Sequence, residues 1–279
     1  MVKTLTSERG APPGSLRYFA VLFAPPATRP VLDALYGFDA QVRAAIDSTA
    51  HEAAHAKLQW WRGEIDRLVA GLPAHPIAVA LAPLRERRDA DIASLHESLV
   101  AADLDLAGLT YRSWEELDAY CHRASGALQM LAAATLAGER TVTTEELEFA
   151  RQLGSAQRQV EMIRDFQQDL RRGRLYLPLE VIEAAGLDPT GWQQAPPKEP
   201  VSGLLDAWRS RVARSLASLP GLLPDRSQRA AQRPGLVLAA LHEQLLKATA
   251  RVPADAGLRA DVGPVARVWT AWRTAVRSA

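Results

Sequence analysis

Three carboxylates spaced four residues apart are the strongest sign of chemistry in this sequence. Glu161, Asp165 and Asp169 occupy positions i, i+4 and i+8, which stack along one face of an α-helix, and several arginines lie close to them in the chain. Oxygen ligands on one face suit a hard divalent cation such as Mg²⁺, which usually binds through a few carboxylates together with phosphate oxygens. This spacing therefore indicates a metal site on a helix.

A simpler interpretation fits the same residues. Three carboxylates and several arginines on one helix are also typical of a solvent-exposed helix face, where side chains of opposite charge four residues apart form ion pairs. In either case the helix should end at Gly173, because glycine readily adopts the left-handed conformation found at helix ends. Residues 175–178 should then be extended, because a residue that precedes a proline avoids the helical conformation.

The composition is typical of a soluble globular protein. The chain has 279 residues, of which 48% are hydrophobic and 23% charged. Its 33 Lys+Arg and 32 Asp+Glu give a formal net charge of +1, which provides no electrostatic reason to expect nucleic-acid binding. The single cysteine, Cys121, excludes an intrachain disulfide framework and fits a reducing, cytoplasmic setting. The longest mostly apolar stretch, residues 127–137, is too short to cross a bilayer, so we expect at most peripheral membrane contact.

Apolar residues recur every three or four positions through most of the chain, a pattern that predicts helices, and no run alternates as strands do. Helices are expected at about 15–25, 28–47, 49–71, 76–100, 113–137, 143–172, 201–219, 227–250 and 262–277. Helix caps are expected at Thr28, at Ser48 or Thr49, at Ser113, and at Thr143 or Thr144. Residues 1–14 should be a flexible N-terminus, and residues 104–110 and 186–200 should be loops. The prediction is one all-α domain, residues 15–279, whose helices surround a central space.

Small residues in the middle of the helix at 113–137 suggest a close contact. Ala124, Ser125 and Gly126 follow one another there, and a glycine inside a helix costs about 1 kcal/mol relative to alanine. This cost favours a reason in packing, such as the close approach of another helix or of a ligand.

Two other motifs have a structural explanation. The HEAAH sequence at 51–55 has the HExxH pattern of zinc peptidases, but it falls in the first turn of its helix and lacks a third ligand at a recognisable spacing. Trp61 belongs to an aromatic and basic stretch that could stack on nucleic-acid bases. However, it shares the apolar helix face with Leu58 and Ile65, which favours a place in the core.

Four stretches, in this order along the chain, resemble the squalene/phytoene synthases, the head-to-head trans-isoprenyl diphosphate synthases. RYFAVLFAP at 17–25 resembles the opening helix of that family, and ALYGF at 34–38 resembles the segment before its first aspartate-rich motif. YCHRASG at 120–126 resembles its YCxxxAG helix. RDFQQDLRRGRLYLP at 164–178 resembles its second aspartate-rich motif, RDxxED…GRxYLP. The resemblance covers roughly residues 15–185, and the C-terminal third matches only as a set of helices.

The resemblance implies an all-α, isoprenoid-synthase-type bundle in which two aspartate-rich motifs face each other across a central cavity. In that family Mg²⁺ ions bridge the carboxylates to the diphosphate of the substrate, whose departure leaves an allylic carbocation. The implied activity is the condensation of two prenyl diphosphates, farnesyl or geranylgeranyl, with Mg²⁺ as the cofactor. Nothing in the sequence speaks for or against NADPH, which some relatives use.

The resemblance also implies roles for individual residues. Tyr120 matches a tyrosine near the reacting centre, and together with Asp165 and Asp169 it forms the expected catalytic set. The expected metal ligands are Asp47, Glu161, Asp165 and Asp169, with Glu161 standing where the family often has an asparagine. The residues expected to bind diphosphate are Arg43, Arg164, Arg174 and Tyr176.

The first aspartate-rich motif departs from the family pattern. Where the family has DDxxD, this chain has RAAID at 43–47, so that only Asp47 keeps a carboxylate. Arg43 could contact the diphosphate directly, or it could pair with the second motif and fill the site. The chain is also similar to a divergent branch that includes a mitochondrial factor for complex I assembly. Three functions therefore stay open: a Mg²⁺-dependent prenyltransferase, a non-catalytic assembly factor that binds a lipid or protein partner, and residual diphosphate binding or hydrolysis.

Overall fold

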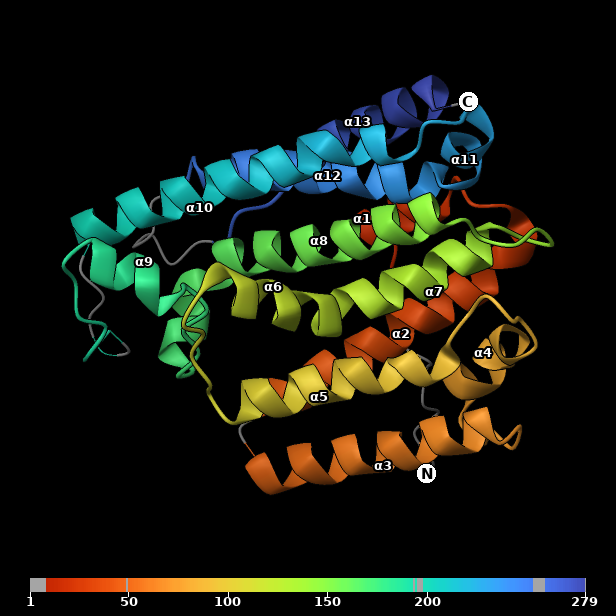
Figure 1. Cartoon of the computed structure of the whole chain (residues 1–279), viewed down its shortest axis with the longest axis horizontal. Coiled ribbons are helices and arrows are strands. Elements are labelled where there is room, and N and C mark those ends of the chain that lie inside the picture. Colours follow the sequence, from red (N-terminus) through yellow and green to blue (C-terminus); the bar gives the residue numbers. More distant parts are fainter. Residues whose placement is uncertain (1–8, 49, 193, 195–197, 253–258, 279) are drawn as a thin grey trace.

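The computed structural model describes residues 9–48, 50–192, 194, 198–252 and 259–278, with the backbone alone at 198–200. Within these residues the chain is built from helices without strands, as the all-α prediction requires (Figure 1). None of the helices in these ranges is both long and apolar enough to cross a bilayer. Part of the terminus expected to be flexible is packed, because the backbone N–H of Ala11 donates to Asp33 Oδ1 at 2.9 Å.

The α-helices are α1 (Leu16–Val21), α2 (Arg29–Ile46), α3 (His51–Val69), α4 (Pro76–Arg85), α5 (Leu95–Leu106), α6 (Trp114–Cys121), α7 (Ala127–Leu136), α8 (Thr144–Arg171), α9 (Leu179–Ala184), α10 (Lys198–Ser218), α11 (Arg226–Ala231), α12 (Arg233–Thr249) and α13 (Pro264–Arg277). A π-helical segment (His122–Gly126) joins α6 to α7, and 3₁₀ turns occupy Pro26–Thr28, Ile92–Ser94 and Leu219–Leu222. The prediction of a loop from residue 104 was wrong, because α5 continues to Leu106, and α9 was not expected.

The helix ends agree with the sequence in part. Thr143 and Glu146 form the expected capping box at the start of α8, and Gly173 ends α8 with φ +79°. Ser113 accepts a hydrogen bond from the N–H of Glu116, as expected. Thr28, however, does not cap α2, because it lies in the preceding 3₁₀ turn and its hydroxyl donates to a backbone carbonyl instead. Ala50, without a side-chain cap, precedes α3 in place of Ser48, and Thr49 lies outside the described residues.

Helix α8 runs through the middle of the bundle (Figure 1). It packs against α10 and α12 on one side and against α6, α7 and the π-helical segment on the other. Beyond α7 lie α2 and α5, and α3 and α4 cover them at the outer edge. Trp61 of α3 is only 2% exposed, which confirms its predicted place in the core, whereas His51 and His55 of the HEAAH sequence are exposed.

The small residues at 124–126 allow α8 to come close. A Cβ atom on Gly154 of α8 would lie 2.6 Å from the carbonyl oxygen of Ser125 and 2.7 Å from Gly126 Cα. Such contacts leave no room for a side chain, so the backbones of α8 and the π-helical segment meet directly. The predicted close approach of another helix is therefore confirmed, and it fixes α8 next to α6, the helix that carries Tyr120.

Candidate functional site

A polar pocket of about 160 Å³ lies where the C-terminal ends of α2 and α8 come together. Its lining includes four carboxylates, from Asp47, Glu161, Asp165 and Asp169. It also includes six guanidinium groups, from Arg43, Arg158, Arg164, Arg172, Arg174 and Arg259. With all ten groups ionised, the lining has two more positive charges than negative ones, which suits an anionic ligand.

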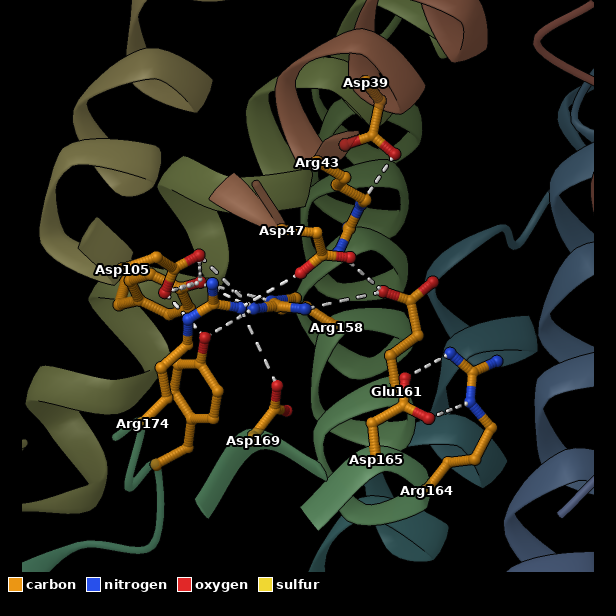
Figure 2. A network of polar contacts seen from close by, with 12 residues as sticks. Asp39, Arg43, Asp47, Asp105, Arg158, Glu161, Arg164, Asp165, Asp169 and Arg174 are labelled. Carbon is orange, nitrogen blue, oxygen red and sulfur yellow. Dashed lines mark hydrogen bonds and ion pairs between the residues drawn. The ribbon is translucent and has the colours of Figure 1, made fainter. Parts of the chain in front are cut away.

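The three carboxylates of α8 face this pocket, and their side chains are largely buried. The exposed fraction is 18% for Glu161, 17% for Asp165 and 10% for Asp169. The interpretation as a solvent-exposed helix face is therefore wrong. Several of the ion pairs also join α8 to other elements, as Figure 2 shows for Glu161 and Arg43.

Arg43 of α2 crosses to the second motif. Its Nε donates to Asp39 Oδ2 at 2.9 Å, and its Nη1 lies 3.0 Å from Glu161 Oε2 (Figure 2). Burial disfavours the charged forms of both carboxylates, but the arginines nearby outweigh it: the pKa of Glu161 is lowered, and that of Asp39 falls to about 2. Of the two roles that the sequence left open for Arg43, the structure has the pairing with the second motif.

Asp165 is held by two arginines at once. Arg164, its neighbour in α8, donates at 2.9 and 2.6 Å, and Arg259, from the segment before α13, donates at 2.7 Å to each carboxylate oxygen. Burial opposes ionisation of this carboxyl, but the hydrogen bonds from Arg164 and Arg259 dominate and lower its pKa to about 2. Asp165 is therefore a fully ionised carboxylate whose oxygen atoms are already occupied.

Asp47, the one carboxylate left in the first motif, is also paired. It accepts from Arg172 Nη1 at 2.6 Å and from Arg174 Nη1 at 3.3 Å. Arg174 additionally donates to the backbone carbonyl of Ile46. The end of α2 is thus tied to the turn that follows α8, and both arginines line the pocket.

Asp169 differs from the other three carboxylates of the pocket. Its nearest paired cation is Arg174, whose Nη1 is 3.9 Å from Asp169 Oδ1, beyond the reach of a hydrogen bond. Burial raises the pKa of Asp169 to about 6, and the negative charge of Asp165 adds to the rise, while Arg158 opposes it. Asp169 is therefore the carboxylate of this pocket whose charge changes near neutral pH.

A buried cluster of four polar side chains lies beside the pocket. The hydroxyls of Tyr120 and Tyr176 donate to Asp105 Oδ1 at 2.8 and 2.7 Å. Arg158 Nη2 donates to the same hydroxyls at 2.8 and 2.9 Å, and it lies 3.5 Å from Asp105 Oδ2 (Figure 2). Burial raises the pKa of both tyrosines above the ordinary value, so both hydroxyls keep their protons. Tyr176, expected to bind diphosphate, does not line the pocket and serves this cluster instead.

A small apolar space adjoins the same cluster. Its volume is about 20 Å³, and it is lined by Val42, Ile46, Ala101, Ala102, Ala124 and Tyr120 together with Ser98 and the charged residues Asp39, Arg43, Asp105 and Arg158. This is room for about one water molecule. A prenyl chain would therefore have to displace side chains of α2, α5 or the π-helical segment to enter here.

The carboxylates do not form a metal cluster in this arrangement. Within the described ranges, no three of the Asp, Glu, His and Cys side chains come together as a metal site. Asp165 and Asp47 accept from arginines, and Glu161 faces Arg43. The donor set therefore does not fit the several Mg²⁺ ions that the resemblance implies, and Mg²⁺ stays a prediction.

Sequence reasoning did not assign four residues that the structure adds to this region: Asp105, Arg158, Arg172 and Arg259. Asp105 had no distinct signal, because Asp103 stands two residues before it and residues 104–110 were expected to form a loop. Arg158 had one, since it precedes Asp165 by seven residues, two helical turns, and so shares its face. Arg259 had none, because it lies 94 positions from Asp165 in the chain.

Comparison with known proteins gives consistent matches. The family model for squalene/phytoene synthase matches residues 13–273. A 15-cis-phytoene synthase from Synechocystis sp. is 30% identical over 176 residues, which are 60% of this chain and 52% of the relative. A phytoene synthase from Mycobacterium tuberculosis is 28% identical over 179 residues, 62% of this chain and 58% of the relative. The chain thus spans about half the length of the curated relatives it matches.

Two solved structures have a similar fold. A dehydrosqualene synthase in complex with a ligand superposes with a TM-score of 0.78 at 17% identity, covering 94% of this chain and 90% of that one. The squalene synthase HpnC from Alicyclobacillus acidocaldarius superposes with a TM-score of 0.69 at 21% identity, covering 84% and 87%. At these identities the likeness concerns the fold.

Proposed function

Because the chain belongs to the squalene/phytoene synthase family, we propose that its arginine-rich pocket binds the diphosphate of a prenyl diphosphate and that the protein joins two such substrates. The observation that carries this proposal is the excess of guanidinium groups, six against four carboxylates, around one polar pocket. An apolar space adjoins the pocket through Arg43 and Arg158, which line both. The anionic head of such a ligand matches the polar pocket, and its apolar tail would enter the small space only after side chains of α2, α5 or the π-helical segment move aside.

The arginines would act on the leaving group. A guanidinium donates two parallel hydrogen bonds to phosphate oxygens and keeps its charge at all working pH values. Arg164, Arg174 and Arg259 line the pocket, and each also donates to a carboxylate of the lining. A bound diphosphate would therefore share these arginines with Asp165 and Asp47. Charge that develops on the departing diphosphate would be stabilised by donors that are already in position.

The buried cluster would fix the orientation of the two tyrosine hydroxyls and would not transfer protons. Tyr120 and Tyr176 both donate to Asp105 and accept from Arg158, so their hydroxyl hydrogens have a fixed direction. The neighbouring apolar residues keep water from the prenyl end of the ligand, which protects an allylic cation from hydrolysis. Tyr120 lies between the polar cluster and that apolar lining.

Mg²⁺, when bound, would neutralise diphosphate oxygens as a Lewis acid. Asp169 is the best candidate to contact it, because the cation paired with it among the described residues, Arg174, is 3.9 Å away, beyond hydrogen-bond distance. Glu161 Oε2 is a second one, since it accepts no hydrogen bond despite the nearby Arg43. In this proposal the arginines provide most of the positive charge, so binding should depend less on Mg²⁺ than a purely acidic site would.

The experiment is a thermal-shift titration with farnesyl and geranylgeranyl thiodiphosphate, each with Mg²⁺ and with EDTA. A ligand at a hundred times its dissociation constant stabilises the folded state by about 2.7 kcal/mol. We expect a shift in both buffers, reduced by Arg164→Gln. The matched control is Arg151→Gln on the same helix, where Arg151 pairs with Glu148 outside the pocket. No shift with either analogue would refute binding of prenyl diphosphates.

A second candidate function follows from one observation. Arg43 occupies the place of a first-motif carboxylate and already pairs with Glu161, which favours a non-catalytic family member that binds a lipid or a protein partner. Incubation with natural substrates and Mg²⁺, followed by product analysis, separates the two. Binding without product would support the second candidate. We expect Arg43→Asp combined with Ala44→Asp to increase the Mg²⁺ dependence of binding if the site uses a metal at all.

A further inference from the structure

The last helix of the chain exposes a row of large apolar side chains. The members of this row are Val265 (81% exposed), Val268 (54%), Trp269 (57%), Trp272 (51%) and Val276 (57%). At the helical rotation per residue they fall within an arc of about 100°. The rings of Trp269 and Trp272 are 5.2 Å apart and tilted by 33°, so the two indoles form one exposed aromatic surface.

The fold itself turns this row outward. Helix α13 packs on α1 and α12 through its small residues, and Ala271 and Ala275 are only 1% and 4% exposed. Arg267 Nη1 donates to the carbonyl of Gly14 at 2.5 Å and fixes the start of the helix against the body of the protein. A surface helix normally buries its apolar side. Here the alanine side is buried instead, and the row stays uncovered by the described residues.

The charges on α13 indicate what covers the row. The helix has three arginines and no acidic residue. Arg273 and Arg277 are exposed and flank the row on one side. Tryptophan prefers the boundary between headgroups and acyl chains, and arginines beside it are attracted to anionic headgroups. Two copies of this face would bring like charges together with no carboxylate on the helix to pair them.

We propose that α13 lies in the plane of an anionic lipid bilayer, with the row of Val and Trp side chains at the acyl boundary and Arg273 and Arg277 among the headgroups. Figure 1 places α13 at one edge of the bundle and α3 at the opposite edge. Docking on lipid would therefore leave α3 and α4 facing water. The inference rests on the surface of α13 alone and does not depend on the proposed function of the pocket.

The test is co-sedimentation with vesicles of phosphatidylglycerol and phosphatidylcholine, compared with phosphatidylcholine alone. We expect binding to the anionic vesicles and a loss of about tenfold or more in Trp269→Ser combined with Trp272→Ser. The control is Trp60→Ser on α3, a tryptophan of similar exposure (46%) on the far edge, which should bind as the wild type does. Arg273→Gln with Arg277→Gln should weaken binding to anionic vesicles only, and high salt should have the same effect.

A second measurement needs no variant. Brominated lipids should quench part of the tryptophan fluorescence of the wild-type protein, since two exposed indoles would reach the acyl boundary. Absence of vesicle binding by the wild type, or unchanged binding by the double Trp variant, would overturn the proposal. So would a wild-type dimer that becomes monomeric in the double Trp variant without any vesicle binding, because a second copy would then cover the row.

Discussion

The raised pKa of Asp169 predicts how the stability of this protein changes with pH. The folded protein holds the pKa of this carboxyl at about 6, against an ordinary value of 3.8. The difference of about 2.2 pKa units corresponds to about 3 kcal/mol. Because the folded-state pKa is the higher one, the neutral acid stabilises the folded state at low pH, and that contribution is lost as the pH rises through 6. Above that pH, the buried charge of Asp169 costs the full amount.

Asp169→Asn keeps the shape of the side chain and removes the titration. The free energy of unfolding of this variant, relative to wild type, should rise by about 2 kcal/mol between pH 4.5 and pH 7.5. The rest of the 3 kcal/mol falls below that window. The measurement is urea denaturation of both proteins in metal-free buffer at several pH values. Subtracting the two free energies of unfolding at each pH cancels the contributions of the groups that titrate alike in both proteins. A difference that stays flat across the window would refute the reasoning from burial.

Asp165→Asn provides the matched control on the same helix. The pKa of Asp165 is lowered to about 2, so its stabilisation is present above 3.8 and is lost only as the pH falls through 2. The variant should therefore be less stable than wild type by about 2 kcal/mol at pH 4.5, and the titration of Asp165 itself changes this difference by less than about 0.2 kcal/mol up to pH 7.5. Loss of the Asp165 charge also lowers the pKa of Asp169, so the difference should shrink towards pH 7.5. Two aspartates one helical turn apart should thus give different pH profiles.

Two further predictions concern packing and the buried cluster. Gly154→Ala should cost about 1–3 kcal/mol in urea denaturation, because its Cβ would meet the Ser125 carbonyl at 2.6 Å. Gly63→Ala, where the nearest atom is 3.9 Å away, should be neutral or stabilising, and equal effects would contradict the close-contact argument. Arg158→Met should cost about 3–5 kcal/mol, because it leaves the buried Asp105 without its cation. Asp105→Asn should recover part of that loss in the double variant, and strict additivity of the two changes would show that they are not coupled.

The sequence predicted the elements of this fold better than their ends. Periodic apolar residues identified the long helices, because packing of one helical face on a core requires that spacing. Local sequence identified the cap at Thr143 and the helix end at Gly173. At these positions a single residue, through its side chain or through the freedom of glycine, is enough to set the backbone conformation. It failed at Thr28, since a 3₁₀ turn held by the preceding prolines competes for the same residue.

The candidate site was predictable only along single helices. Spacing alone placed Glu161, Asp165 and Asp169 on one face, and the structure has all three at one pocket. The spacing does not predict which arginine pairs with each carboxylate. Arg43 and Arg259 reach this face from 118 and 94 positions away, as the separations of Arg43–Glu161 and Arg259–Asp165 show. Such partners depend on how helices cross, which no local pattern encodes.

Arg43 changes the charge of the pocket more than the loss of one carboxylate would, because a positive group stands where the family has a negative one. Asp39 and Arg43 of α2 and Asp47 at its C-terminal cap alternate in sign at four-residue intervals. Arg43 joins this row to α8 through its ion pair with Glu161. A chelator can remove a metal ion that is bound between two sets of carboxylates. It cannot remove an arginine side chain, which is covalently part of the protein. If arginines neutralise the bound diphosphate here, chelation should weaken binding less than substitution of a pocket arginine does. Asp169, whose ion pair with Arg174 is 3.9 Å long and so beyond hydrogen-bond distance, is then where any remaining metal dependence should lie.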